Sequence, residues 1–121
     1  TKLVRVIQGS VLDVAVDIRE NSPTFGQHVS VELTAQNKKQ LLIPRGFAHG
    51  FVVLEDDTVF AYKVDNYYSP DCDRGIAFDD EALGIDWILN HEELNLSAKD
   101  KVQPKLNETN DLFEYGINYY E

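Results

Sequence analysis

Hydrophobic and polar residues alternate with a period of two along much of the first half of the chain. The clearest run is at residues 11–19, where every even position, from Leu12 to Ile18, is apolar. Successive side chains of a β-strand point to opposite faces, so this period predicts a strand. Alternating runs at 3–8 and 27–34 predict two more strands, and the turn signal Gln8-Gly9-Ser10 predicts a hairpin between the first two runs.

Shorter apolar runs follow in the middle of the chain. Residues 41–43 and 51–54 predict strands on either side of a Pro-Arg-Gly turn, and residues 58–65 predict another strand. The three acidic residues at 55–57 predict a solvated hairpin tip between the last two strands.

The pattern changes after Pro70. Residues 79–84 predict one helical turn with Asp79 or Asp80 as its cap, and residues 85–89 predict a short strand-like run. Residues 90–105 are polar and irregular. The tail at 111–121 carries four aromatic residues, which we expect to pack on the rest of the chain or on a partner. Many short strands with little helix predict one all-β domain of jelly-roll type spanning residues 1–121.

Composition and charge narrow the possible functions. No apolar run approaches the roughly 18 residues of a membrane span, so we expect no membrane partner. The net charge of −10, from 21 acidic and 11 basic residues, disfavours nucleic acid as a partner. A single cysteine, Cys72, cannot form an internal disulfide framework and fits a reducing compartment, so we expect a cytoplasmic protein.

The turn before residue 50 has a recognisable pattern. Pro44 to His49 reads P-x-G-x-x-H, which resembles the second conserved motif of the cupin barrels. Metal-binding cupins add an H-x-H motif, whereas this chain has only His28, His49 and His91, far apart in sequence. Because an imidazole metal site needs several ligands on one ion, we expect no metal and no other cofactor.

A wider resemblance covers nearly the whole chain. The segments KLVRVIQGSVLDVAVDIRENSPTFGQ, LLIPRGFAHGFVVL, YKVDNYYSP, GIDW and LSAKD are similar, in order, to dTDP-4-dehydrorhamnose 3,5-epimerase. The resemblance implies a metal-free, cupin-type jelly-roll barrel that works as a homodimer. It also implies a reaction in which C3 and C5 of dTDP-4-dehydro-6-deoxyglucose are inverted to give dTDP-4-dehydro-L-rhamnose.

The same resemblance implies three catalytic residues. Tyr62, in the YK of YKVDNYY, matches the family's proton donor. Lys2, in KLVRV, matches the lysine that stabilises an enolate at the C4 oxygen. Asp100, in LSAKD, matches the aspartate that pairs with the catalytic histidine and raises its basicity.

Four further residues are implied as substrate-binding. His49 and Asp13 match polar residues that line the family's cavity. Tyr67 matches an aromatic position at the nucleotide end of the cleft, and Lys99 is a candidate for contact with the diphosphate.

The family's general base is a histidine in an R-G-L-H-x-Q motif that precedes KLVRV. Since this chain begins at Thr1-Lys2, it resembles an N-terminally incomplete epimerase, and we expect the 121-residue chain to be inactive or severely impaired. Alternatives are an epimerase for another 4-keto nucleotide sugar, acting at one or both carbons, and a cupin that binds a sugar nucleotide without catalysis. A metal-dependent cupin is a third class.

Overall fold

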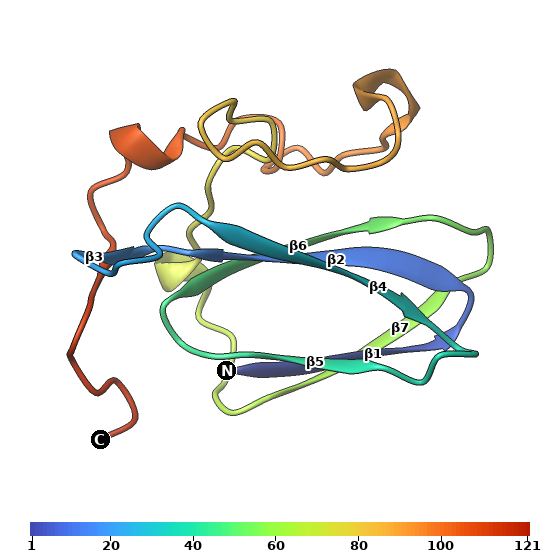
Figure 1. The fold of residues 1–121 in the computed structure, drawn as a ribbon, viewed down its shortest axis with the longest axis horizontal. Helices are drawn as coiled ribbons and strands as arrows, with labels where there is room; N and C mark the ends of the chain where they lie inside the picture. The colour runs from blue at the N-terminus through green and yellow to red at the C-terminus, as the bar shows by residue number, and fades with distance from the viewer.

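The computed structural model describes residues 1–121 and consists of two facing antiparallel sheets, with a long C-terminal segment laid over one of them (Figure 1). This confirms the expectation of an all-β, jelly-roll-type fold. The first sheet contains, in spatial order, β5 (Gln40–Ile43), β1 (Lys2–Gln8) and β7 (Val59–Val64). The second contains β4 (His28–Thr34), β2 (Ser10–Asp17) and β6 (Phe47–Val53). A parallel pair joins β3 (Arg19–Glu20) to β8 (Phe113–Glu114).

Both predicted hairpins are wrong, because the turns are corners between the sheets. β1 pairs with β5 and β7, whereas β2 pairs with β4 and β6, so the turn at Gly9 takes the chain from one sheet into the other. Gly9 has φ +82°, and a Cβ there would lie 2.2 Å from Thr58 Oγ1, so the corner requires glycine. The acidic turn at residues 55–57 likewise carries the chain from β6 to β7 in the opposite sheet.

The central strand β2 is buried along its whole length. Its side chains at odd positions face the other sheet, as the pairing of Val11 with Leu33 and of Asp13 with Phe51 shows. The core between the sheets is formed by Val4, Val6, Val11, Ala15, Leu33 and Ile43.

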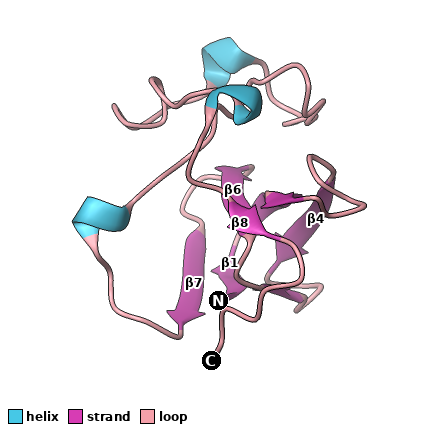
Figure 2. Cartoon of the chain, turned by 90° about the vertical axis from the view of Figure 1, so that its left-hand side faces the viewer, coloured by secondary structure: helices cyan, strands magenta, loops and turns pink.

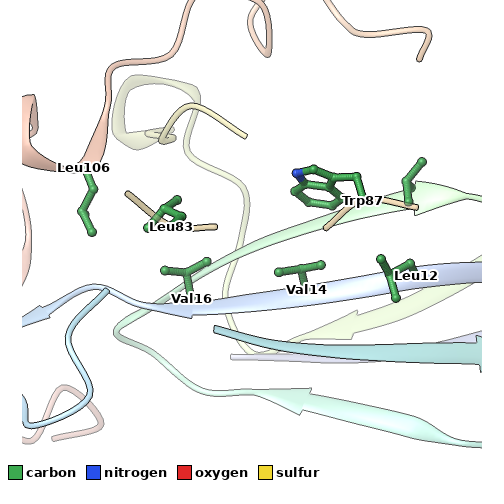
Figure 3. Packing of buried hydrophobic residues seen from close by; sticks show 7 residues of the cluster. Leu12, Val14, Val16, Leu83, Trp87 and Leu106 are labelled. Atoms are coloured by element: carbon green, nitrogen blue, oxygen red, sulfur yellow. The ribbon is translucent and has the colours of Figure 1, made fainter. Parts of the chain in front are cut away.

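The opposite face of β2 supports a second core. Leu12, Val14 and Val16 point away from the sandwich and pack beneath the C-terminal segment (Figure 3). The side chains that cover them are Leu83, Trp87 and Leu106. Trp87 is also held by its indole N–H, which donates to the Phe78 carbonyl at 2.8 Å. The C-terminal segment is therefore a third layer fixed by its own core.

The C-terminal segment contains little regular structure (Figure 2). Residues 79–84 form hydrogen-bonded turns in place of the predicted helical turn. The strand predicted at 85–89 is absent, because Gly84 and Ile88 have φ of +63° and +68° and no strand pairs with this run. Three single-turn 3-10 helices occur elsewhere, at Pro70–Cys72, His91–Glu93 and Leu106–Glu108.

The aromatic tail packs on the rest of the chain, which confirms the first of the two expectations for it. The Phe113 and Tyr119 rings meet edge to face at 4.9 Å between centroids. The guanidinium of Arg45 lies 4.7 Å from the Tyr120 ring centroid and also donates to the Tyr119 carbonyl. The tail therefore holds the turn between β5 and β6. No helix is long and apolar enough to span a bilayer.

Candidate active site

The turn at Pro44–Gly46 sets the start of β6 and thereby the position of His49. Gly46 has φ +93°, and a Cβ there would meet the Arg19 side chain at 2.7 Å, so this turn also requires glycine. The Gly46 carbonyl accepts a hydrogen bond from the Ile18 N–H at 3.1 Å. The turn is therefore tied to the end of β2 before the chain reaches His49.

Arg19 stabilises the turn at Gly46 by binding the buried carboxylate of Asp17. Its Nε and Nη2 donate to the two oxygens of Asp17, each at 2.9 Å, and its guanidinium lies 4.9 Å from the Phe47 ring centroid. The hydroxyls of Ser22 and Thr24 also donate to Asp17 Oδ2. Burial acts to raise the pKa of Asp17, but these hydrogen bonds outweigh it and hold the pKa far below the usual range.

His49 and Asp13 form the central polar pair of the site. His49 Nε2 lies 2.7 Å from Asp13 Oδ1, between neighbouring strands of one sheet. Asp13 is 0% exposed, and its Oδ2 has no hydrogen-bond partner. Sequence reasoning left open whether Asp13 was solvated or turned into a cavity, and the structure places it in the interior beneath His49.

An aromatic row crosses from His49 to the other sheet. The Phe51 ring lies 6.2 Å from His49 and 4.4 Å from Phe60, whose ring is 6.3 Å from that of Tyr62. Lys2 continues the row, with Nζ 5.8 Å from the Tyr62 ring centroid. Tyr62 is opposite Val4 in the register and therefore faces inward, yet it is 60% exposed because β7 is an edge strand.

A cleft of about 1070 Å³ opens where residues 76–100 pass over β6. Its walls are mostly hydrophobic, from β6, Val14, Val16 and the C-terminal segment including Trp87. The polar side chains that line it are Lys2, His49, Glu55, Asp56, Glu93, Asn95, Ser97, Lys99 and Asp100.

The cation Lys99 is anchored at this cleft. Its Nζ lies 3.0 Å from Asp73 Oδ2, and this hydrogen bond raises the pKa of Lys99 and lowers that of Asp73. Asp100 follows on the same turn, where its N–H donates to Ser97 Oγ at 3.3 Å, and its carboxylate forms no hydrogen bond within the chain. The site thus combines a fixed ammonium with a free carboxylate.

The structure brings together four of the seven residues singled out from the sequence: Lys2, His49, Lys99 and Asp100 line one cleft. Asp13 lies behind His49 and does not line the cleft. Tyr62 does not line the cleft, but its ring lies next to Lys2, which does. Tyr67 is 97% exposed and outside the cleft.

Sequence reasoning missed several residues that shape the site. Phe51 and Trp87 contribute to its apolar walls, Phe60 packs behind Phe51, and Asp73 fixes Lys99. The alternation in residues 58–65 places Phe60 on the same face as Tyr62, but no sequence signal connects Asp73 to a lysine 26 residues away.

The chain has no group of three or more His, Cys, Asp or Glu side chains arranged to hold a metal ion. His49 is paired with Asp13 on β6, His91 packs against Phe78 with ring centroids 5.3 Å apart, and His28 lies on the edge strand β4.

A family model described as dTDP-4-dehydrorhamnose 3,5-epimerase matches residues 1–108. The dTDP-4-dehydrorhamnose 3,5-epimerase of Salmonella typhimurium is 55% identical over 107 residues, which are 88% of this chain and 58% of that protein.

Solved structures agree with the family match. A dTDP-6-deoxy-D-glucose-3,5-epimerase from Legionella pneumophila, in complex with dTDP-4-keto-L-rhamnose, superposes with a TM-score of 0.91 at 48% identity, over 96% of this chain and 62% of that one. The Bacillus anthracis dTDP-4-dehydrorhamnose 3,5-epimerase, with TDP and PPi bound, gives a TM-score of 0.83 at 48% identity, over 87% and 59%. The chain thus spans less than two thirds of the length of these relatives.

Proposed function

The chain belongs to the dTDP-4-dehydrorhamnose 3,5-epimerase family, and on that premise we propose that it acts on a dTDP-linked 4-keto-6-deoxyhexose. The substrate is dTDP-4-dehydro-6-deoxyglucose, and inversion at C3 and C5 gives dTDP-4-dehydro-L-rhamnose. The observation that carries the proposal is that Lys2, His49, Lys99 and Asp100 line the same cleft. The product bound to the Legionella relative supports the choice of sugar.

The chemistry explains why these residue types are needed. C3 and C5 flank the C4 ketone, so removal of a proton from either carbon leaves negative charge on the C4 oxygen. An ammonium near that oxygen stabilises the charge, and an acid on the opposite face of the ring returns the proton with inversion. Lys2 supplies the ammonium and Tyr62 supplies the acid, with the lysine nitrogen 5.8 Å from the tyrosine ring centroid.

Asp100 is proposed to orient a histidine base. Within residues 1–121, none of the three histidines is hydrogen-bonded to Asp100, and His49 is already paired with Asp13. We therefore expect this chain alone to remove the C3 and C5 protons slowly. A cleft in which one catalytic group is not in place still binds and polarises its substrate, so we expect the rate to stay above that of the uncatalysed reaction.

The nucleotide is proposed to bind at the Lys99 end of the cleft. The Lys99 ammonium, held by Asp73, is available to a diphosphate. Tyr67 projects into solvent, so its contact with the nucleotide base requires the loop after β7 to close over the ligand. The TDP bound to the Bacillus relative supports a nucleotide site of this kind.

A homodimer in the cytoplasm completes the proposal. Large apolar side chains on the outward face of the β5–β1–β7 sheet, among them Ile7, Leu42 and Val59, are about half exposed or more, and such a surface favours a partner. The free thiol of Cys72 fits a reducing compartment. Size-exclusion chromatography with light scattering tests for the dimer. We expect a mass twice that of the 13.8 kDa chain, and a monomer at micromolar concentration would contradict the proposed dimer.

The reaction is tested by incubating the protein with dTDP-4-dehydro-6-deoxyglucose in deuterated water and following each sugar carbon by NMR. We expect deuterium at both C3 and C5, above a buffer blank and more slowly than with the Salmonella relative. Exchange at one carbon only would assign a mono-epimerase. No exchange despite binding would leave a non-catalytic sugar-nucleotide binder, and a rate equal to that of the relative would refute the expected impairment.

A further inference from the structure

Asp13 is a buried carboxylate next to the cleft, and the role argued for it rests on the proposed function of that cleft. Asp13 lies in the middle of β2, is 0% exposed and does not line the cleft, whereas its partner His49 does. A ligand in the cleft therefore meets the imidazole and not the carboxylate. Any influence of Asp13 on the ligand has to pass through His49.

The hydrogen bond between the two side chains decides which ring nitrogen of His49 carries a proton. A carboxylate is only an acceptor, so at the 2.7 Å separation Nε2–H donates to Asp13 Oδ1. In the neutral ring the lone pair is then on Nδ1, which forms no hydrogen bond within the chain. His49 is thereby made an acceptor for a group in the cleft.

Aromatic side chains border the imidazole as well. The Phe51 and Phe60 rings lie 6.2 and 6.5 Å from the His49 centroid, with interplanar angles of 30° and 26°. Because Phe51 and Phe60 are themselves only 4.4 Å apart, both rings border the imidazole from the same side, while Asp13 holds its Nε2.

A carboxylate at the buried position of Asp13 also lowers the stability of the fold. Its Oδ2 is buried without a hydrogen-bond partner, an arrangement that native interiors rarely contain. A residue selected only for packing would not be a half-satisfied buried carboxylate. The unpartnered oxygen therefore points to a role for Asp13 beyond stability.

We propose that Asp13 is a positioning residue that locks His49 with Nδ1 as a hydrogen-bond acceptor, and that this acceptor receives a hydroxyl of the hexose. The C4 ketone oxygen has no proton to donate, so it is disfavoured at His49 and favoured at the Lys2 ammonium. With a hydrogen-bond acceptor at His49 and a donor at Lys2, the hexose ring would bind in one orientation. Such an arrangement decides which ring carbons reach the catalytic groups.

The tautomer of His49 provides a test that needs no activity. Long-range 15N–1H NMR distinguishes the two neutral tautomers, and spectra taken at alkaline pH, where an ordinary imidazole is neutral, isolate them. We expect His49 in the Nε2–H form in the wild-type chain, a tautomer mixture in Asp13→Ala, and recovery of the Nε2–H form in Asp13→Asn, whose amide oxygen still accepts. His28 and His91 in the same spectra are internal controls and should not change.

Three results would overturn the proposal: His49 in the Nδ1–H form, His49 still doubly protonated at that pH, or an unchanged tautomer in Asp13→Ala. The wild-type spectrum alone decides the first two, so the test survives even if Asp13→Ala fails to fold.

Calorimetric titration with dTDP and with dTDP-glucose tests the link to the sugar. The ratio of the two affinities reports the contribution of the hexose. We expect Asp13→Ala to lower that ratio by about 5- to 10-fold, the effect of one hydrogen bond, and to leave dTDP binding unchanged. An equal ratio in both proteins contradicts the proposal. If the wild-type chain binds neither ligand, the proposed function fails while the tautomer result still stands.

Discussion

Asp13 and Asp17 are four residues apart on β2, and their side chains share the inward face of the strand. Asp17 is satisfied by Arg19, Ser22 and Thr24, whereas Asp13 has His49 alone and leaves one oxygen unpaired. The full set of hydrogen bonds around Asp17 is typical of a residue that stabilises the fold. The unpaired oxygen of Asp13 is instead consistent with the proposed role in positioning His49. Two identical residue types on one face thus have opposite consequences for stability.

The replacement Asp17→Asn removes a buried charge that three side chains are arranged to meet. We expect a loss of about 3 kcal/mol in the free energy of unfolding, because Arg19 loses its partner and the corner at Gly46 loosens. Urea denaturation followed by tryptophan fluorescence measures the change. Asp79→Asn, at an exposed aspartate with no hydrogen-bonded partner, is the matched control and should stay within about 0.5 kcal/mol of wild type.

The same residue sets an acid dependence. The folded-state pKa of Asp17 lies below its unfolded value, so its contribution to stability is complete above the unfolded pKa of about 4 and is lost as the pH falls below that value. The melting temperature of the wild type should therefore fall more steeply below about pH 4 than that of Asp17→Asn. Parallel melting curves for the two proteins in that range would contradict the assignment.

Tyr62 carries the prediction that is most specific to the reaction. If it returns the proton on the far face, Tyr62→Phe still allows the enolate to form and to be reprotonated on the face from which the proton left. We expect inversion to fall by about 100-fold and deuterium exchange to fall much less. Tyr115→Phe makes the same chemical change at a residue packed on Arg19 away from the cleft, and it should leave the ratio of inversion to exchange unchanged.

At the scale of elements, the period-two pattern predicted strand positions well and strand pairing poorly. The runs at 3–8, 11–19 and 27–34 correspond to β1, β2 and β4 within one or two residues at most ends, because alternation reports directly on a pleated backbone. The predicted strand at 51–54 begins four residues earlier, at Phe47, because Ala48 and Gly50 blur the apolar pattern. A turn signal shows that the chain reverses direction but not which sheet it enters. The glycine turn at Gly9 was therefore predicted to be a hairpin, although it is a corner between the two sheets.

The C-terminal segment shows where sequence periodicity fails altogether. Trp87 and Leu106 are buried on the outer face of β2, yet neither belongs to a periodic run, because the segment is extended and irregular. The same limit applies to the site. The family resemblance indicated seven residues as one site, of which four line the cleft, but the apolar walls depend on packing that only the folded chain reveals.

Trp87→Ala tests the docking of that segment. The side chain is 9% exposed, packs on the outer face of β2 and lines the cleft. We expect a loss of about 3–5 kcal/mol in the free energy of unfolding together with weaker binding of dTDP-glucose. Val102→Ala, on the same segment at a residue 78% exposed, serves as the control and should change neither quantity. Unchanged stability in Trp87→Ala would mean that the segment is not docked as described.

At the scale of the whole molecule, β2 belongs to both hydrophobic cores. Val11 and Ala15 pack between the sheets, whereas Leu12, Val14 and Val16 pack under the C-terminal segment. The two cores therefore cannot come apart independently without exposing one face of the same strand. This arrangement supports the prediction of a single domain over residues 1–121.

Cooperative unfolding follows from that shared strand. We expect thermal denaturation to show one transition, with tryptophan fluorescence, which reports the outer core around Trp87, and far-ultraviolet circular dichroism, which reports the sheets, giving the same midpoint. Trp87 is the only tryptophan, so the fluorescence signal has one source. Separate midpoints for the two signals would show that the C-terminal segment melts on its own.

The corners between the sheets also determine the order in which the chain can fold as it is synthesised. Within residues 1–121, β1 is synthesised well before its partners β5 and β7, so Lys2 cannot pair with Ile43 or with Val64 until those strands have emerged. Only β2 and β4 pair in the same sheet without another long strand between them. Folding is therefore dominated by distant partners, which makes it slow. Through that interval an apolar strand that includes Val4 and Val6 remains unpaired at the ribosome, where it is vulnerable to aggregation.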